Sequence, residues 1–177
     1  MKQLLYIFNF MLLSNMVLAQ NINVESKSIK SNFENKNIVA YQANSESKVK
    51  EFYQYLSLYS QQTDSKLKEQ IKANIFSLVE NPSIEMIDLT IENDSKISLQ
   101  DLLHKIENQN IKFEVLSTQT SSDIAQNHWQ MNYKIQVKKD DDKSSKELQQ
   151  IIYFEPINKQ FGSKSKTVWS IKLGAVL

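Results

Sequence analysis

Apolar and polar side chains alternate without a break over residues 128–138, and this pattern constrains the fold more than any other in the chain. Successive side chains of a β-strand point to opposite faces, so a period of two predicts a strand with one buried and one solvated face. Such a strand needs neighbouring strands and a second layer to cover its apolar face. The residues predicted to point inward are Trp129, Met131, Tyr133, Ile135 and Val137.

Three other segments of the C-terminal half are also predicted strands. Residues 111–120 open with alternating apolar positions, residues 148–156 are apolar on both faces and so fit a central strand, and residues 167–173 alternate again. Residues 139–146 form a charged connection. Because consecutive strands with short connections run antiparallel, the C-terminal half is predicted to form a mainly antiparallel sheet.

Helical periodicity precedes these strands. Apolar residues recur at helical spacing over residues 45–60 and 67–79, with Thr63 or Asp64 as a cap and Pro82 as the stop signal of the second helix. The apolar side chains of a predicted strand over residues 84–92 change parity, which indicates a bulge or two covered faces. Ser98 and Asp101 resemble a capping box, and they predict a short third helix.

The fold class that follows is α+β. Two long N-terminal helices and a short third helix are expected to pack on a curved, mainly antiparallel sheet. Residues 45–177 are long enough for one domain with a substantial core.

The first 19 residues have the three parts of a secretory signal peptide. Lys2 gives the positive start, residues 4–13 form an apolar run, and residues 17–19 (Val-Leu-Ala) fit a cleavage site. We therefore expect an exported bacterial protein, periplasmic or secreted, with no membrane span after cleavage; a retained anchor is the alternative. Residues 20–44 are rich in Asn, Ser and Lys, and they predict a flexible leader.

Composition excludes several classes of chemistry. The chain has no cysteine, which excludes disulfides, thiol catalysis and thiolate metal sites. All 21 basic residues are lysines and the formal net charge is +1, so there is no overall field to attract a nucleic acid. Gly162 and Gly174 are isolated, and no glycine-rich phosphate loop exists. No cofactor or metal is predicted.

The order of predicted elements resembles the cone-shaped fold of the nuclear transport factor 2-like superfamily, which includes SnoaL-like and ketosteroid isomerase-like proteins. The resemblance covers residues 45–177. It implies that the bent sheet and the helices enclose a pocket, and that a homodimer can form through the sheet. The segments that carry it are Glu51-Phe52-Tyr53, Ile75-Phe76-Ser77-Leu78, Leu102-Leu103 and Val168-Trp169-Ser170-Ile171.

Two kinds of site residue follow from these patterns. Aromatic side chains of the predicted helix and strands can line a ligand pocket or form plain core. Asp88 is a carboxylate within an apolar segment; it is either a buried base or, as we expect, a solvent-facing residue. The pocket candidates are Tyr53, Trp129, Tyr133, Phe154 and Trp169.

Other candidates for chemistry are weak. His104 and His128 are far apart in sequence, and we expect both to be ordinary, partly exposed residues. The acidic run over residues 140–142 lacks the later positions of a calcium loop, and a solvated connection is the simpler interpretation.

Three functions remain open. The first is a non-catalytic exported domain that binds a small apolar ligand or a protein partner. The second is an isomerase or dehydratase with Asp88 as base and Tyr53 or Tyr133 as hydrogen-bond donor. The third is an envelope accessory or immunity-type factor that binds a protein.

Overall fold

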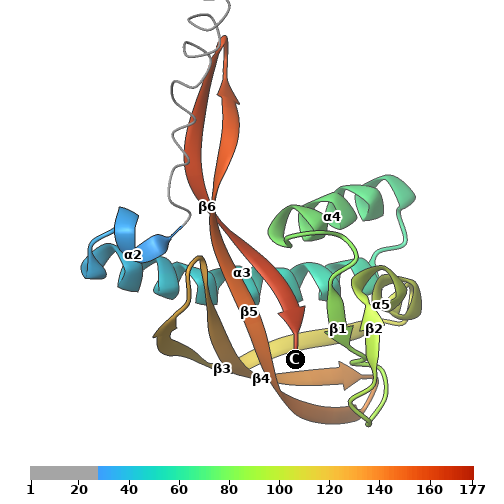
Figure 1. Cartoon of the computed structure of the whole chain (residues 1–177). Coiled ribbons are helices and arrows are strands. Elements are labelled where there is room, and N and C mark those ends of the chain that lie inside the picture. Colours follow the sequence, from blue (N-terminus) through green and yellow to red (C-terminus); the bar gives the residue numbers. More distant parts are fainter. Residues whose placement is uncertain (1–27) are drawn as a thin grey trace, which may run out of the picture.

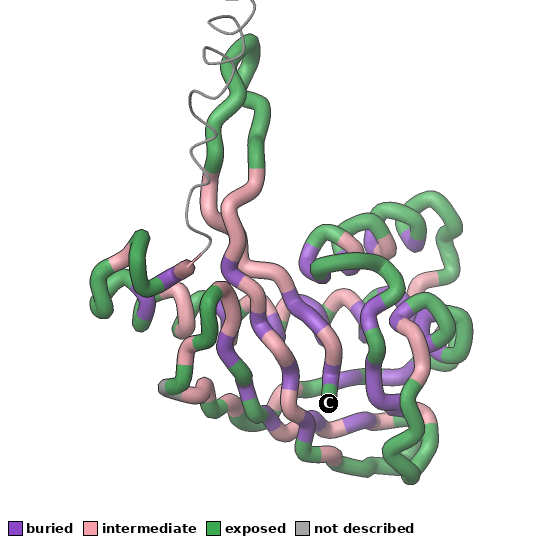
Figure 2. The backbone as a smooth tube through the Cα atoms, in the orientation of Figure 1, coloured by how far each residue is buried: buried purple, intermediate pink, exposed green. Residues whose placement is uncertain are grey.

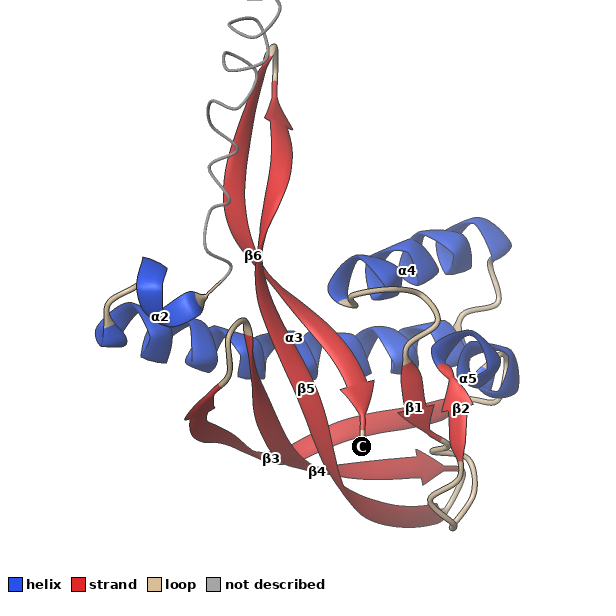
Figure 3. Ribbon diagram, in the orientation of Figure 1, coloured by secondary structure: helices blue, strands red, loops and turns tan. Residues whose placement is uncertain are grey.

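The structure is a computed structural model that describes residues 28–177 (Figure 1). It is an α+β fold in which helices pack on a curved antiparallel sheet (Figure 3). The elements in order are α2 (Ile29–Asn32), α3 (Asn35–Gln61), α4 (Ser65–Leu78), β1 (Glu85–Ile87), β2 (Lys96–Ser98), α5 (Leu99–Ile106), β3 (Ile111–Ile124), β4 (His128–Lys139), β5 (Asp142–Phe161) and β6 (Lys164–Val176).

The four long strands form an antiparallel sheet in the order β3-β4-β5-β6, as the sequence predicts. Strand β4 keeps its alternation, and its five predicted inward side chains are all buried. β5 lies between β4 and β6, which confirms its prediction as a central strand. Irregular register between Val115 and Ser117, and again between Thr120 and Ile124, interrupts the pairing of β3 with β4.

Helix α3 packs on β3 and covers the edge of this strand that pairs with no other strand. Ser57 Oγ accepts a hydrogen bond from Phe113 N at 2.8 Å, and Ser60 Oγ accepts one from Ile111 N at 2.9 Å. β3 is an edge strand, so these contacts occupy backbone donors that could otherwise pair with another chain. Two buried serines, unremarkable in the sequence, therefore fix helix and sheet together.

The N-terminal prediction needs correction. Helix α3 begins at Asn35, ten residues before the predicted start at Ser45, and α2 precedes it. The leader expected over residues 20–44 is thus largely helical where the structure describes it, because Phe33 and Tyr41 pack on the core. Residues 20–27 and the signal sequence over residues 1–19 lie outside the described residues.

The predicted capping residues of α4 and α5 are confirmed, whereas the strand predicted between these two helices is only partly right. Asp64 caps α4, accepting a hydrogen bond from Leu67 N at 2.8 Å, and Ser98 accepts one from Asp101 N at 3.1 Å. The strand expected over residues 84–92 is wrong in extent, because only Glu85–Ile87 is a strand. It pairs with the unpredicted β2, and residues 88–95 form the loop between them.

The connection expected over residues 139–146 is also shorter than predicted. Lys139, the last residue of β4, pairs directly with Asp142, so only residues 140–141 form the turn, and Asp142, Lys143 and Lys146 belong to β5. Asp140 has a φ of 52°, a left-handed conformation that Asp tolerates better than most residues.

The distal part of the β5–β6 hairpin extends well beyond the rest of the molecule (Figure 1). β4 pairs with β5 only as far as Tyr153, whereas β5 pairs with β6 out to Phe161 and Lys164. Residues 158–167 are all exposed (Figure 2). We call residues 157–168 the arm.

Gly174 marks a close approach inside the same hairpin. A Cβ placed there would lie 2.6 Å from Cε2 of Tyr153 and 3.2 Å from the Ile151 carbonyl oxygen. We expect Gly174→Ala to lower the free energy of unfolding by about 1–2 kcal/mol, because the ring and the strand must shift. Chemical denaturation measures the loss, and Gly174→Ala in a Tyr153→Ala background should recover part of it. An unchanged midpoint in both variants would contradict this packing.

Among residues 28–177, no helix is long and apolar enough to cross a membrane.

Candidate functional site

Three of the aromatic pocket candidates belong to one packed cluster. Phe154 lies 6.2 Å from Trp129 and 5.0 Å from Trp169, measured between ring centroids. Phe33 and Tyr41 close the cluster, at 5.3 and 4.3 Å from Phe154. Trp129 and Phe154 are each 1% exposed, so these rings contact one another as a core does.

The other two candidates, Tyr53 and Tyr133, share a buried chain of hydrogen bonds. Their hydroxyl oxygens are 2.8 Å apart, and the Tyr133 hydroxyl donates to Gln150 Oε1 at 3.2 Å. The Gln150 amide then donates to the Gly174 carbonyl oxygen at 3.0 Å. Since Tyr133 gives its proton to Gln150, Tyr53 is the donor to Tyr133, and both phenol protons are used within the protein.

Both phenols stay protonated at ordinary pH. Burial raises the pKa of Tyr53, against a smaller lowering by the bond to Tyr133. Burial also raises the pKa of Tyr133, and the neighbouring Tyr53 raises it further. The pair is therefore a neutral link between α3 and the sheet, in which each hydroxyl has a hydrogen-bond partner.

Asp88 is buried, and the expectation that it faces solvent was wrong. Its side chain is 0% exposed; Oδ1 accepts from Thr90 N at 2.9 Å and from Thr90 Oγ1 at 2.6 Å, and Oδ2 pairs with Lys105. Burial alone would raise the pKa of Asp88, but the bonds from Lys105 and Thr90 outweigh it and hold the pKa below its usual value. Asp88 therefore stays ionised as an anchor for the β1–β2 loop.

The structure does not join Asp88 to the tyrosines. Asp88 bonds to Thr90 and Lys105, whereas Tyr53 and Tyr133 bond to each other and to Gln150. An isomerase-type site requires the base and the donor to meet at one ligand. These groups instead complete two separate structural networks.

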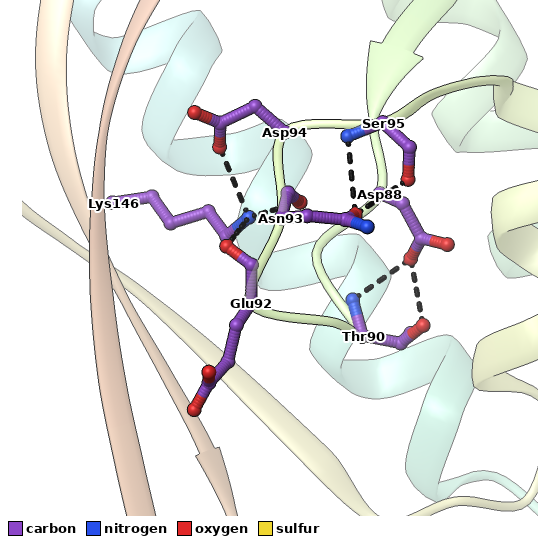
Figure 4. A network of polar contacts seen from close by, with 7 residues as sticks. All are labelled: Asp88, Thr90, Glu92, Asn93, Asp94, Ser95 and Lys146. Atoms are coloured by element: carbon purple, nitrogen blue, oxygen red, sulfur yellow. Dashed lines mark hydrogen bonds and ion pairs between the residues drawn. The ribbon is translucent and has the colours of Figure 1, made fainter.

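The β1–β2 loop is held in place by polar contacts (Figure 4). Lys146, from β5, donates to the carbonyl oxygens of Glu92 and Asn93 at 3.1 and 2.8 Å and pairs with Asp94 at 3.2 Å. The Asn93 side chain in turn accepts from Ser95 Oγ at 2.8 Å. Because hydrogen bonds and ion pairs hold this loop at both its base and its tip, it forms one wall of a hollow beside the start of β5.

A groove of about 890 Å³ runs between that wall and the β4–β5 turn. Ile91, which is 40% exposed, contributes apolar surface, and Ser144 and Ser145 contribute hydroxyls. Its volume is in the range of small-molecule sites. We call it the lysine groove. Its charged lining residues are Glu92, Lys105, Lys139, Asp142, Lys143 and Lys146.

The four lysines of the groove differ in how they are held. Lys105 and Lys146 have the partners given above, and Lys139 donates to Gln109 Oε1 at 3.0 Å. Within the described part of the chain, Lys143 has neither a hydrogen bond nor an ion pair. The groove therefore offers one uncommitted ammonium group beside three positioned ones, a suitable arrangement for an anion.

A second groove, of about 560 Å³, lies on the outer face of the sheet. Its charges balance, with Lys134 against Glu147, and Gln149 donates to Asn132 across it at 3.0 Å. This balance gives it no preference for a charged ligand.

The histidines do not form a site together. His104 is exposed on α5, and the ring of His128 lies 5.6 Å from that of Tyr153. Over residues 28–177 there is no group of three His, Cys, Asp or Glu side chains that could hold a metal ion.

Sequence reasoning missed every lysine of the groove. They come from α5, the end of β4 and the start of β5, and a lysine in a charged segment is usually only a solvated residue. The one signal available was the density of lysine around the acidic run over residues 140–142.

Comparisons of the chain with protein-family models and with curated proteins find no match.

Proposed function

We propose that the protein is an exported binding domain with the cone-like fold of the nuclear transport factor 2-like superfamily, and that it binds a small anionic molecule in the lysine groove. The fold assignment is supported by the element order: the helices α3 and α4, the β1–β2 pair, α5, then four antiparallel strands. Export is supported by the signal-like pattern of residues 1–19.

The observation that carries the ligand class is the charge of the groove. Four lysines line it against two acidic residues; Lys105 and Lys146 are paired with Asp88 and Asp94, which leaves Lys139 and Lys143 as the lining lysines without an ion pair to a described residue. Lysine offers point charges rather than the bidentate fork of arginine, so it suits separate carboxylate groups as well as phosphate. The apolar surface and the two serines complement the rings and hydroxyls of an acidic sugar.

Binding to trigalacturonate is the first test. We expect saturable binding by calorimetry that weakens as salt rises, and no binding of neutral maltotriose. Replacing Lys139 and Lys143 by Gln should weaken the affinity about tenfold or more, since each hydrogen bond to a charged group contributes about 1.5–3 kcal/mol.

The matched control is Lys50→Gln with Lys66→Gln, which removes the same charge from exposed helix positions. Equal weakening in both double variants would show a general charge effect and contradict the groove as the site. Inorganic tripolyphosphate, tested alongside, separates a preference for phosphate from one for carboxylate.

A further inference from the structure

One face of the arm is basic, and its lysines have no hydrogen-bond or ion-pair partner in the described part of the chain. In an antiparallel pair, directly opposite residues share a face, and the face alternates from one pair to the next. The register therefore places Lys159 opposite Lys166 and Phe161 opposite Lys164 on the same face. The other face has only neutral polar pairs in its distal half: Asn158 with Thr167, and Gln160 with Ser165.

This arrangement is unfavourable for an isolated hairpin. Like charges directly opposite each other destabilise a strand pair, and two-stranded ribbons are marginal in water. Residues 156–169 contain three lysines and no acidic residue. No hydrogen bond or ion pair joins these lysines to another described residue.

The base of the arm, in contrast, is firmly built. Trp169 packs against Phe33 and Phe154, each at 5.0 Å between ring centroids. At the tip, Gly162 has a φ of 62°, which fits the first central position of a two-residue type II′ turn. A fixed base and a tight tip hold the ribbon away from the body (Figure 2). Phe161, beside the turn, is 53% exposed.

We propose that the arm is a membrane-contact element that binds the surface of an anionic phospholipid bilayer. An aromatic ring at the tip suits the boundary between headgroups and acyl chains, and lysines around it suit anionic headgroups. A projecting tip reaches a flat surface without obstruction by the body. Arginine, the residue best suited to nucleic-acid recognition, is absent from the chain.

Co-sedimentation of the full chain with vesicles tests this role. We expect binding to phosphatidylglycerol vesicles, little to phosphatidylcholine vesicles, and loss of binding at high salt. Replacing Lys159, Lys164 and Lys166 by Gln should weaken the partition about a hundredfold, given the attraction of each lysine to an anionic surface. The apolar run of residues 4–13 is present in every variant, so the difference between variants reports on the arm alone.

Two controls separate this role from simpler ones. A triple Gln variant at Lys50, Lys66 and Lys112, all exposed outside the arm, should keep most of the binding. Phe161→Ser should weaken binding further than Leu116→Ser, since both are exposed apolar residues but only one lies at the tip.

Circular dichroism confirms that each variant is folded, and removal of the opposed lysines should not lower the melting temperature. The lysines could instead serve only to keep an edge from pairing with other chains. In that case the arm variant would form oligomers in gel filtration while its vesicle binding stayed unchanged. That result, or equal loss in the two triple variants, would overturn the proposal and direct the search to an acidic protein.

Discussion

Replacing Phe154 by alanine is expected to lower the free energy of unfolding by about 3–5 kcal/mol, the usual cost of removing a buried ring. Phe154 is 1% exposed, and its ring packs with four others: Phe33, Tyr41, Trp129 and Trp169. Denaturant titration measures the change. The loss would show that these rings form core rather than the wall of an open pocket.

Phe161→Ala is the matched control, because it removes the same ring from an exposed position on the same strand. It should change the free energy of unfolding by no more than about 0.5 kcal/mol. If Phe154→Ala also lowered the free energy of unfolding by less than about 1 kcal/mol and changed ligand binding, the aromatic cluster would line a pocket. The sequence alone leaves that alternative open.

The sheet was predictable because its information is local. An alternation such as that of residues 128–138 specifies a strand wherever one face is buried, and turns of two or three residues then bring consecutive strands together. The helices α4 and α5 were equally clear, with Asp64 and Ser98 at their N-caps. The capping side chain and the helix that it starts are neighbours in the sequence.

The predictions failed where a distant contact decides the structure. The polar start of α3 is helical because it packs on β3, with Gln42 donating to the Ser121 carbonyl oxygen at 3.1 Å and Glu46 accepting from Thr118 at 2.9 Å. β2 exists because β1 offers it a partner. Tertiary contacts of this kind override local propensity.

The lysine groove was invisible in the sequence for the same reason. Lys105 and Lys143 are 38 positions apart, and only the fold brings α5 beside the start of β5. Asp88 was misjudged because strand alternation was assumed to continue past Ile87, where the chain already turns into the loop. A buried carboxylate in a loop needs a cation, and the sequence does not say which of 21 lysines supplies it.

Replacing Lys105 by methionine should destabilise the protein by about 2 kcal/mol at pH 7, because it leaves the ionised Asp88 buried without its cation. Removing one partner of a fully buried pair costs about 3–5 kcal/mol, but the Lys105 side chain is 47% exposed, and solvent screening reduces the effect. Lys66→Met, at an exposed helix position, is the control and should have little effect.

The pH dependence of this loss identifies its cause. In the wild type the pKa of Asp88 is below its usual value, so its contribution to stability is present above an unfolded pKa of about 3.9 and is lost as the pH falls through the folded pKa. In Lys105→Met, burial is no longer offset by the cation, and the folded pKa of Asp88 rises. Protonation of Asp88 then removes the buried charge. The difference in the free energy of unfolding between variant and wild type should therefore become smaller from pH 7 toward pH 4. A gap of constant size across that range would show that Lys105 acts through packing of its alkyl chain, and that Asp88 is held by Thr90 alone.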